Sequence, residues 1–255
     1  MIKRKIYYVS QMMILLVMYC SNLFANGDVE LHDDWGFILK KYVHVGKVDY
    51  NKIISTPADL KRLNDYLISL GNTEVSLLSR EERLAFWINA YNAFTVKLIL
   101  NHYPLKSIKG IKNPWKQKLW YVSSEKLSLD DIEHIKLREE FREPRIHFAI
   151  VCASIGCPAL YSEAFEKDNI EQQLILVTRN FFTECRNFQL KTSGRTTTVY
   201  LNRIFKWFES DFGKDHKHIV EFILSYVQES DRDIINASDT VKIKYLDYDW
   251  SLNDR

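Results

Sequence analysis

The segment from Arg80 to about His102 carries apolar side chains on nearly every face of a helix, and this feature constrains the fold most. Within residues 84–94, every side chain except two carboxamides is apolar or aromatic. A helix that is apolar all round is buried on all sides, so we expect this one to run through the centre of the domain. Ser79 followed by Glu82 predicts a capping box at its start, and Pro104 predicts its end.

The two carboxamides of this helix, Asn89 and Asn92, are spaced so that they share one helical face. A buried carboxamide without partners costs about 1–3 kcal/mol, so both side chains should have specific hydrogen-bond partners. One hypothesis is that they brace a neighbouring loop, and the other is that they position a catalytic group or a substrate. The sequence alone favours bracing.

The remainder of the chain predicts an α+β protein: a single, mostly helical domain around the buried central helix, with a small β-sheet, over residues 30–255. The aromatic content of 13% and the formal net charge of +2 exclude a disordered chain and argue against a broad nucleic-acid surface. The spacing of apolar and capping residues predicts further helices over residues 33–43, 57–71, 128–138, 170–185, 203–211 and 216–228. Strands are predicted over residues 118–122, 146–152, 188–190, 196–201 and 241–246, with a hairpin turn at Ser193-Gly194.

The N-terminus has the layout of a secretory signal. Lys3, Arg4 and Lys5 are followed by an apolar run from Met12 to Met18, and the pattern ends at Ala25. We therefore predict a signal peptide over residues 1–25 and an exported protein that is periplasmic or secreted. The apolar run is shorter than the roughly 20 residues of a membrane-spanning helix, so no stable membrane span should remain after cleavage. An uncleaved N-terminal anchor is the alternative.

Export changes the interpretation of the cysteines. Loss of Cys20 with the signal leaves Cys152, Cys157 and Cys185, so at most one intramolecular disulfide can form. Cys152 and Cys157 are close enough in sequence to close one across the turn at Gly156. A Cys-x4-Cys spacing without a second Cys or His pair is a weak metal motif, and we predict neither a metal nor a cofactor.

Cys152 ends the predicted strand 146–152 and leads into a turn of small residues, Ala153, Ser154 and Gly156. Such a turn leaves room for a substrate and exposes backbone N–H groups that suit an oxyanion. Because side chains alternate along a strand, His147 should point away from Cys152. We therefore expect His147 to be a buried histidine with a fixed partner rather than the base for this thiol.

A second histidine lies in the predicted helix 128–138. His134 and Arg138 share a helical face, and Glu133 lies beside them. One hypothesis is that these three residues only form a charged, solvent-exposed face of the helix. The other makes His134 a general base that meets the Cys152 thiol from a different segment.

Several of these motifs resemble the family called domain of unknown function 547. The resemblance rests on residues 87–93 (Trp-Ile-Asn-Ala-Tyr-Asn-Ala), 129–138, 147–158, 205–212 and 248–253, which occur in the order found in the family. It covers roughly residues 35 to 253. What it implies for function is limited, because the family is largely uncharacterised.

Two classes of function fit the sequence. The first is a thiol-dependent hydrolase or acyl transferase with Cys152 as nucleophile, His134 as base and Glu133 as its orienting group. Its ligand would be a small molecule or a peptide, and the candidate binding residues are Asn89, Asn92, Trp87, Ser154 and Arg138. The second is a non-enzymatic envelope binding or structural domain, in which a Cys152–Cys157 disulfide only stabilises the fold. Nucleic-acid binding is disfavoured by the charge balance.

Overall fold

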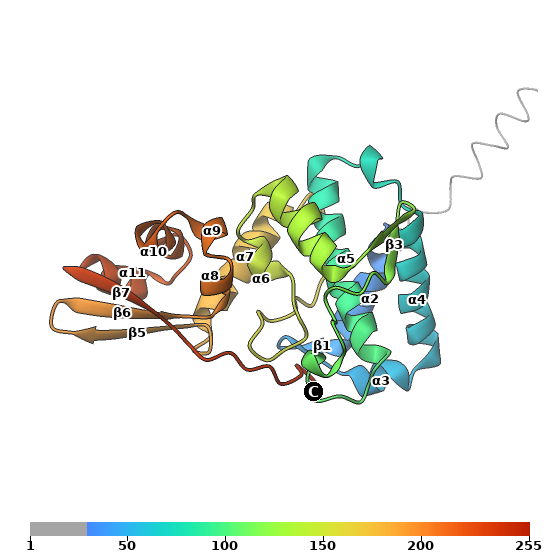
Figure 1. Cartoon of the computed structure of the whole chain (residues 1–255), viewed down its shortest axis with the longest axis horizontal. Helices are drawn as coiled ribbons and strands as arrows, with labels where there is room; N and C mark the ends of the chain where they lie inside the picture. Colours follow the sequence, from blue (N-terminus) through green and yellow to red (C-terminus); the bar gives the residue numbers. More distant parts are fainter. Residues whose placement is uncertain (1–29) are drawn as a thin grey trace, which may run out of the picture.

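Helix α5 (Arg80–Leu100) is buried along most of its length, as predicted, and every residue from 84 to 96 is buried. The predicted capping box is present, because Ser79 Oγ accepts from the Glu82 amide and the Glu82 carboxylate accepts from the Ser79 amide. The computed structural model describes residues 30–255 (Figure 1). The predicted signal peptide, with Ala25 and Cys20, lies outside the described residues.

Three helices and two short hairpins accompany α5 in the N-terminal half, and α3 and α4 pack against it. The helices are α2 (Asp33–Tyr42), α3 (Tyr50–Ile54) and α4 (Pro57–Asn72). The hairpins pair β1 (Val43–His44) with β2 (Lys47–Val48) and β3 (Trp120–Val122) with β4 (Glu125–Leu127). Pro57 occupies the first turn of α4, where its missing N–H costs no helical hydrogen bond. The helices predicted over residues 33–43 and 57–71 are therefore confirmed.

The predicted helix at residues 128–138 forms as the π-helical segment η3 (Asp131–Glu139), which packs against α5. Its start is held by the predicted pair, since Ser128 Oγ accepts from the Asp131 amide and the Asp131 carboxylate accepts from the Ser128 amide. Wider π-helical turns are rare and are often found at functional sites.

The strand predicted over residues 146–152 is wrong. Residues 146–149 form one helical turn, α6 (Ile146–Ala149), in which the Ile150 amide donates to the Ile146 carbonyl at 3.0 Å. The segment is apolar on all sides because it is buried on all sides, and such a short run does not distinguish a strand from a buried helix by its periodicity. The chain becomes extended only at Ile150.

The C-terminal half holds a three-stranded sheet and five helices. The strands are β5 (Phe188–Ser193), β6 (Thr196–Leu201) and β7 (Thr240–Tyr245), in the order β5-β6-β7. The helices are α7 (Ile170–Thr183), α8 (Ile204–Trp207), α9 (Glu209–Phe212), α10 (His216–Leu224) and α11 (Glu229–Asn236). The predicted β5–β6 hairpin is confirmed, and β7 joins β6 in parallel. The predicted helix 203–211 is broken at Phe208 into α8 and α9, and α11 was not predicted.

The chain after β7 returns from the sheet to the N-terminal half, as the red trace in Figure 1 shows. The Val48 amide donates to the Asn253 carbonyl at 2.9 Å, and the Asn253 amide donates to the Ala153 carbonyl at 3.0 Å. This C-terminal segment, residues 246–254, therefore joins the two halves and passes beside the turn that follows Cys152. None of the helices formed by residues 30–255 is long and apolar enough to cross a membrane.

Candidate functional site

A cavity of about 240 Å³ lies where α5, η3, α6, α8 and the C-terminal segment meet. Three of the side chains predicted to be catalytic line it: Cys152, His134 and Glu133. Cys157 and His147 line it as well. The structure therefore brings together residues that are far apart in the sequence and were predicted to act together.

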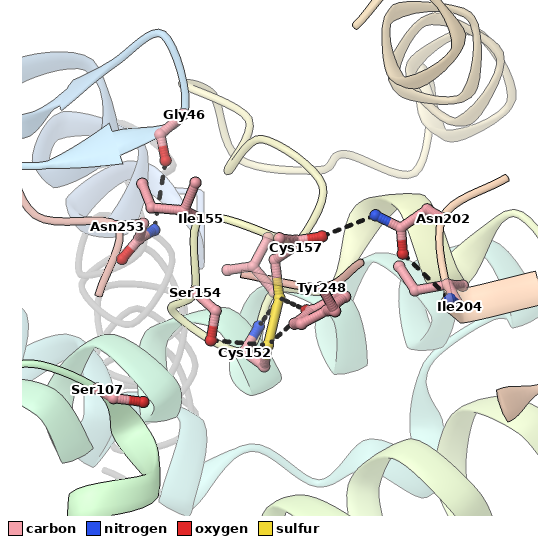
Figure 2. The surroundings of a disulfide bond; sticks show 12 residues. Gly46, Ser107, Cys152, Ser154, Ile155, Cys157, Asn202, Ile204, Tyr248 and Asn253 are labelled. Carbon is pink, nitrogen blue, oxygen red and sulfur yellow. Dashed lines mark hydrogen bonds between the residues drawn. A yellow bond between two sulfur atoms is a disulfide. The ribbon is translucent and has the colours of Figure 1, made fainter. Parts of the chain in front are cut away.

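Cys152 and Cys157 form a disulfide, with their Cα atoms 6.2 Å apart (Figure 2). Neither sulfur is a free thiol in this state, so any thiol chemistry at Cys152 requires the disulfide to be reduced. The Tyr248 hydroxyl lies 3.2 Å from Cys152 Sγ and donates to Cys157 Sγ at 3.1 Å. Among residues 30–255, Cys185 is the cysteine that remains free, and it is exposed.

Hydrogen bonds to the C-terminal segment and from Asn202 fix the turn between the two cysteines. The Ile155 and Gly156 amides donate to the Ser251 and Asp249 carbonyls, both at 2.8 Å, while Asn202 Nδ2 donates to the Gly156 carbonyl at 2.9 Å. A Cβ on Gly156 would lie 2.9 Å from the backbone of Asp249. The prediction that Gly156 makes room for a substrate and offers its N–H to an oxyanion is therefore wrong, because the C-terminal segment occupies that space.

Asn89 and Asn92 brace loops, as the favoured hypothesis predicted. Asn89 exchanges two hydrogen bonds with the backbone of Phe165, at 2.8 and 2.9 Å. Asn92 Nδ2 donates to the Ala149 carbonyl and its Oδ1 accepts from the Val151 amide, both at 2.9 Å. Neither side chain lines the cavity. Asn92 fixes the backbone immediately before Cys152, so its effect on the site is to position Cys152.

His147 is buried and has a fixed partner, as predicted, and the structure identifies that partner as Asp211. Burial alone would raise the pKa of Asp211, but hydrogen bonds from Arg138 and His147 outweigh it and hold that pKa well below its ordinary value. The carboxylate is therefore ionised, and His147 Nε2 donates to it at 2.7 Å. Burial lowers the pKa of His147, against the opposing effect of Asp211, so the imidazole is neutral near pH 7.

The prediction that His147 points away from Cys152 is wrong, because both side chains line the same cavity. That prediction assumed strand alternation, and residue 147 lies instead in the helical turn α6. With its Nε2 bound to Asp211, the neutral ring keeps its lone pair on Nδ1, and the bond to Asp211 is the only hydrogen bond that this ring makes with residues 30–255. A carboxylate that fixes the tautomer of an imidazole in this way is the arrangement of a general base.

His134 contacts Arg138 rather than a carboxylate. Arg138 donates two hydrogen bonds to the Asp211 carboxylate, at 2.6 and 2.8 Å, and its Nη1 lies 2.9 Å from His134 Nδ1. A guanidinium only donates, so His134 Nδ1 is the acceptor and the proton of the neutral ring is on Nε2. Burial and then the charge of Arg138 lower the pKa of His134. Arg138, predicted to bind a ligand, is engaged in this network and does not line the cavity.

Glu133 accepts a hydrogen bond from the Tyr91 hydroxyl at 3.1 Å and does not contact His134 in the orienting role predicted for it. Loss of hydration raises the pKa of Glu133 from 4.5 to about 7. Asp130, which also lines the cavity, contributes to this rise by its charge. The carboxyl therefore changes its charge near neutral pH.

Two other predicted binding residues lie away from the open space. Trp87 is 3% exposed and faces a separate cavity with Ser76 and Lys136. Its Nε1 has no hydrogen-bond partner among the described residues. Ser154 is buried and does not line the cavity, and its Oγ lies 3.5 Å from Cys152 Sγ.

Sequence reasoning missed the aromatic wall of the cavity. Trp115, Trp207, Tyr248 and Trp250 line it, and Tyr248 and Trp250 pack with their ring centroids 4.6 Å apart. Three of these four side chains lie in the blocks 205–212 and 248–253, which carried part of the family resemblance. Because aromatic side chains are ordinary core residues in most proteins, their type alone did not mark them as part of a site.

Within residues 30–255, no group of three or more His, Cys, Asp or Glu side chains is placed to hold a metal ion.

Comparison with known proteins gives one match. Residues 75–182 match the sequence model of a family described as "Protein of unknown function, DUF547". No curated protein and no solved structure matches the chain significantly. The matched residues include α5, η3 and the Cys152–Cys157 turn, whereas the aromatic blocks near residues 207 and 250 lie outside them. The chain therefore contains, over residues 75–182, a domain of the DUF547 family of proteins of unknown function.

Proposed function

We propose that this protein is an exported thiol-dependent hydrolase or acyl transferase. In the proposal Cys152 is the nucleophile, His147 is its general base, and Asp211 orients the base. One observation carries it: Cys152 and an Asp211-bound histidine line the same cavity. Export is supported by the basic, apolar and small-residue pattern of residues 1–25.

His147 suits the role of base better than His134, which the sequence pattern favoured. A base must accept a proton, and the neutral His147 ring has an unoccupied Nδ1 because Asp211 holds the proton on Nε2. His134 has its Nδ1 occupied by Arg138, and the nearby guanidinium opposes a second positive charge on that ring. Arg138, which binds both carboxylate oxygens of Asp211, then serves to position Asp211.

The reaction begins with the disulfide open. A dithiol reductant gives up two hydrogens, is itself oxidised to a disulfide, and leaves Cys152 and Cys157 as thiols. His147 Nδ1 takes the proton of the Cys152 thiol, and the thiolate attacks the carbonyl carbon of an ester or amide. The leaving group departs with the proton from His147, and an acyl-thioester remains on Cys152. Water, or another acceptor, then attacks the thioester and regenerates the thiol.

Tyr248 supports the thiolate in this proposal. Its hydroxyl lies within hydrogen-bond distance of both sulfurs, and burial raises its pKa above its ordinary value. The hydroxyl therefore stays protonated and donates. A hydrogen bond to the ionised form of a group favours that form, so Tyr248 should stabilise the Cys152 thiolate.

The alternative is a non-enzymatic envelope binding or structural domain. The disulfide itself favours it, because Cys152 has no free thiol in this state. Under this alternative the cavity binds a ligand without chemistry, and reduction only destabilises the fold.

The test uses protein in a Cys185→Ser background, which removes the exposed thiol. Reduced protein is mixed with p-nitrophenyl acetate. We expect a burst of about one p-nitrophenolate per protein and acetylation at Cys152, found by mass spectrometry. Oxidised protein and reduced Cys152→Ser should show no burst, while reduced Cys157→Ser should keep it. Release of p-nitrophenolate at the same slow rate from all four preparations would contradict the proposal. It would favour the non-enzymatic binding or structural domain.

A further inference from the structure

The chemistry of the cavity wall indicates what kind of molecule it receives. Trp115, Trp207, Tyr248 and Trp250 form one aromatic surface, with neighbouring ring centroids 4.6 to 6.0 Å apart. Trp207 is 44% exposed although it is large and apolar. Aromatic groups left partly open at a cavity mouth offer both π-faces and apolar area to a ligand.

The charged groups at this cavity have one sign. Among the described residues, its lining includes the carboxylic acids Asp130 and Glu133 and no lysine or arginine. The two histidines that line it, His134 and His147, are held neutral by burial, since burial lowers the pKa of each. An anionic ligand would therefore meet carboxyl groups, and no lysine or arginine among the described residues that line the cavity would offset their charge.

The aromatic surface already binds a cation from within the chain. Lys109 Nζ lies 3.6 Å from the centroid of the Trp250 ring, close enough for a cation–π contact. Lys109 does not line the cavity, so it contacts Trp250 without occupying the open space. One ring of the aromatic surface thus makes a cation–π contact with an ammonium group of the chain itself.

We propose that the cavity binds an organic ammonium group, held against Trp115, Trp207, Tyr248 and Trp250 and facing the carboxyl groups of Glu133 and Asp130. Aromatic walls with nearby carboxylates recognise ammonium groups through the ring quadrupoles and through charge. A volume of about 240 Å³ accommodates a small ammonium compound or the ammonium end of a longer substrate. This inference rests on the proposed function only in calling the ligand a substrate.

The test compares two molecules of the same shape. Choline and 3,3-dimethylbutan-1-ol differ in one atom, a positively charged nitrogen in place of a carbon. Binding to the oxidised protein is measured by calorimetry and by quenching of tryptophan fluorescence. Because oxidised protein has no thiol at Cys152, failure of the thiol chemistry cannot affect the result. We expect saturable choline binding that is about ten-fold tighter than that of the neutral alcohol.

Variants place the binding in this cavity. Trp207→Leu and Glu133→Gln should each weaken choline binding about five-fold or more. Tyr121→Leu changes another exposed aromatic side chain, 59% exposed, that does not line the cavity, and it should leave the affinity unchanged. Equal affinity for the two molecules, or no choline binding, would overturn the proposal. Binding of a neutral sugar such as N-acetylglucosamine in place of choline would also overturn it and assign the aromatic wall to carbohydrate.

Discussion

His147 Nε2 lies 2.7 Å from Asp211 Oδ2, and this contact joins two elements that are 64 residues apart in the sequence. The carboxylate is shared, because Arg138 binds it at the same time through two nitrogens. Arg138 keeps Asp211 ionised, and Asp211 keeps the proton of His147 on Nε2. The outcome is a neutral imidazole of defined tautomer at the edge of the cavity that Cys152 lines.

Replacing either buried asparagine of α5 should destabilise the protein. Asn89→Leu and Asn92→Leu each leave one backbone N–H and one carbonyl without their partners in the interior. We expect the free energy of unfolding to fall by about 1–3 kcal/mol in each variant. Urea unfolding measures this. If both variants unfolded like the wild type, the hydrogen bonds of α5 to its neighbouring loops would not contribute to stability.

The close approach at Gly156 gives a second stability prediction. Gly156→Ala places a methyl group 2.9 Å from the backbone of Asp249, so the C-terminal segment must shift away from the Cys152–Cys157 turn. We expect a loss of about 1–3 kcal/mol in unfolding free energy. Gly110→Ala is the matched control, because a Cβ there meets no atom within 4 Å. Equal stability of the two variants would show that the segment tolerates displacement.

Glu133 should make stability depend on pH. Its pKa rises from 4.5 to about 7 on folding, so the unfolded chain releases this proton more readily than the folded protein does. The folded state therefore loses stability as pH rises from about 4.5 to about 7, by about 3 kcal/mol.

The variant Glu133→Gln removes this ionisation and keeps an oxygen that can accept from Tyr91. It should raise the melting temperature at about pH 8 and change it much less at about pH 5. Glu139→Gln, at an exposed position of the same helix, is the control and should show no such difference. A melting-temperature gain that is the same at both pH values would contradict the buried ionisation.

The sequence predicted the central helix because an apolar pattern on all faces has only one structural solution, burial on all sides. It also placed Cys152, His134 and Glu133 at one site. It misplaced His147 because the short run 146–152 is apolar whether it forms a strand or a buried turn. Asp211 could not be paired with His147 from sequence, since that contact depends on how α9 packs against α6. The close approach at Gly156 could not be predicted either, because it also depends on tertiary packing. The segment that covers Gly156 lies about ninety residues further along the chain.

The most direct test of the central claim is the pH dependence of Cys152 alkylation in the reduced protein. Iodoacetamide labelling is followed at each cysteine by mass spectrometry from about pH 5.5 to about pH 9, with the exposed Cys185 as an internal reference. Ordinary thiols ionise near pH 8.5, and a paired thiol ionises at lower pH. The account predicts that Cys152 reacts at about pH 6.5 while Cys185 does not. The variants His147→Asn and Asp211→Asn should remove this reactivity at low pH. Two control variants should retain it: His134→Asn, and Asp215→Asn, which changes the exposed pair of Asp215 with His218. A Cys152 profile that coincides with that of Cys185 in the wild type would contradict the account.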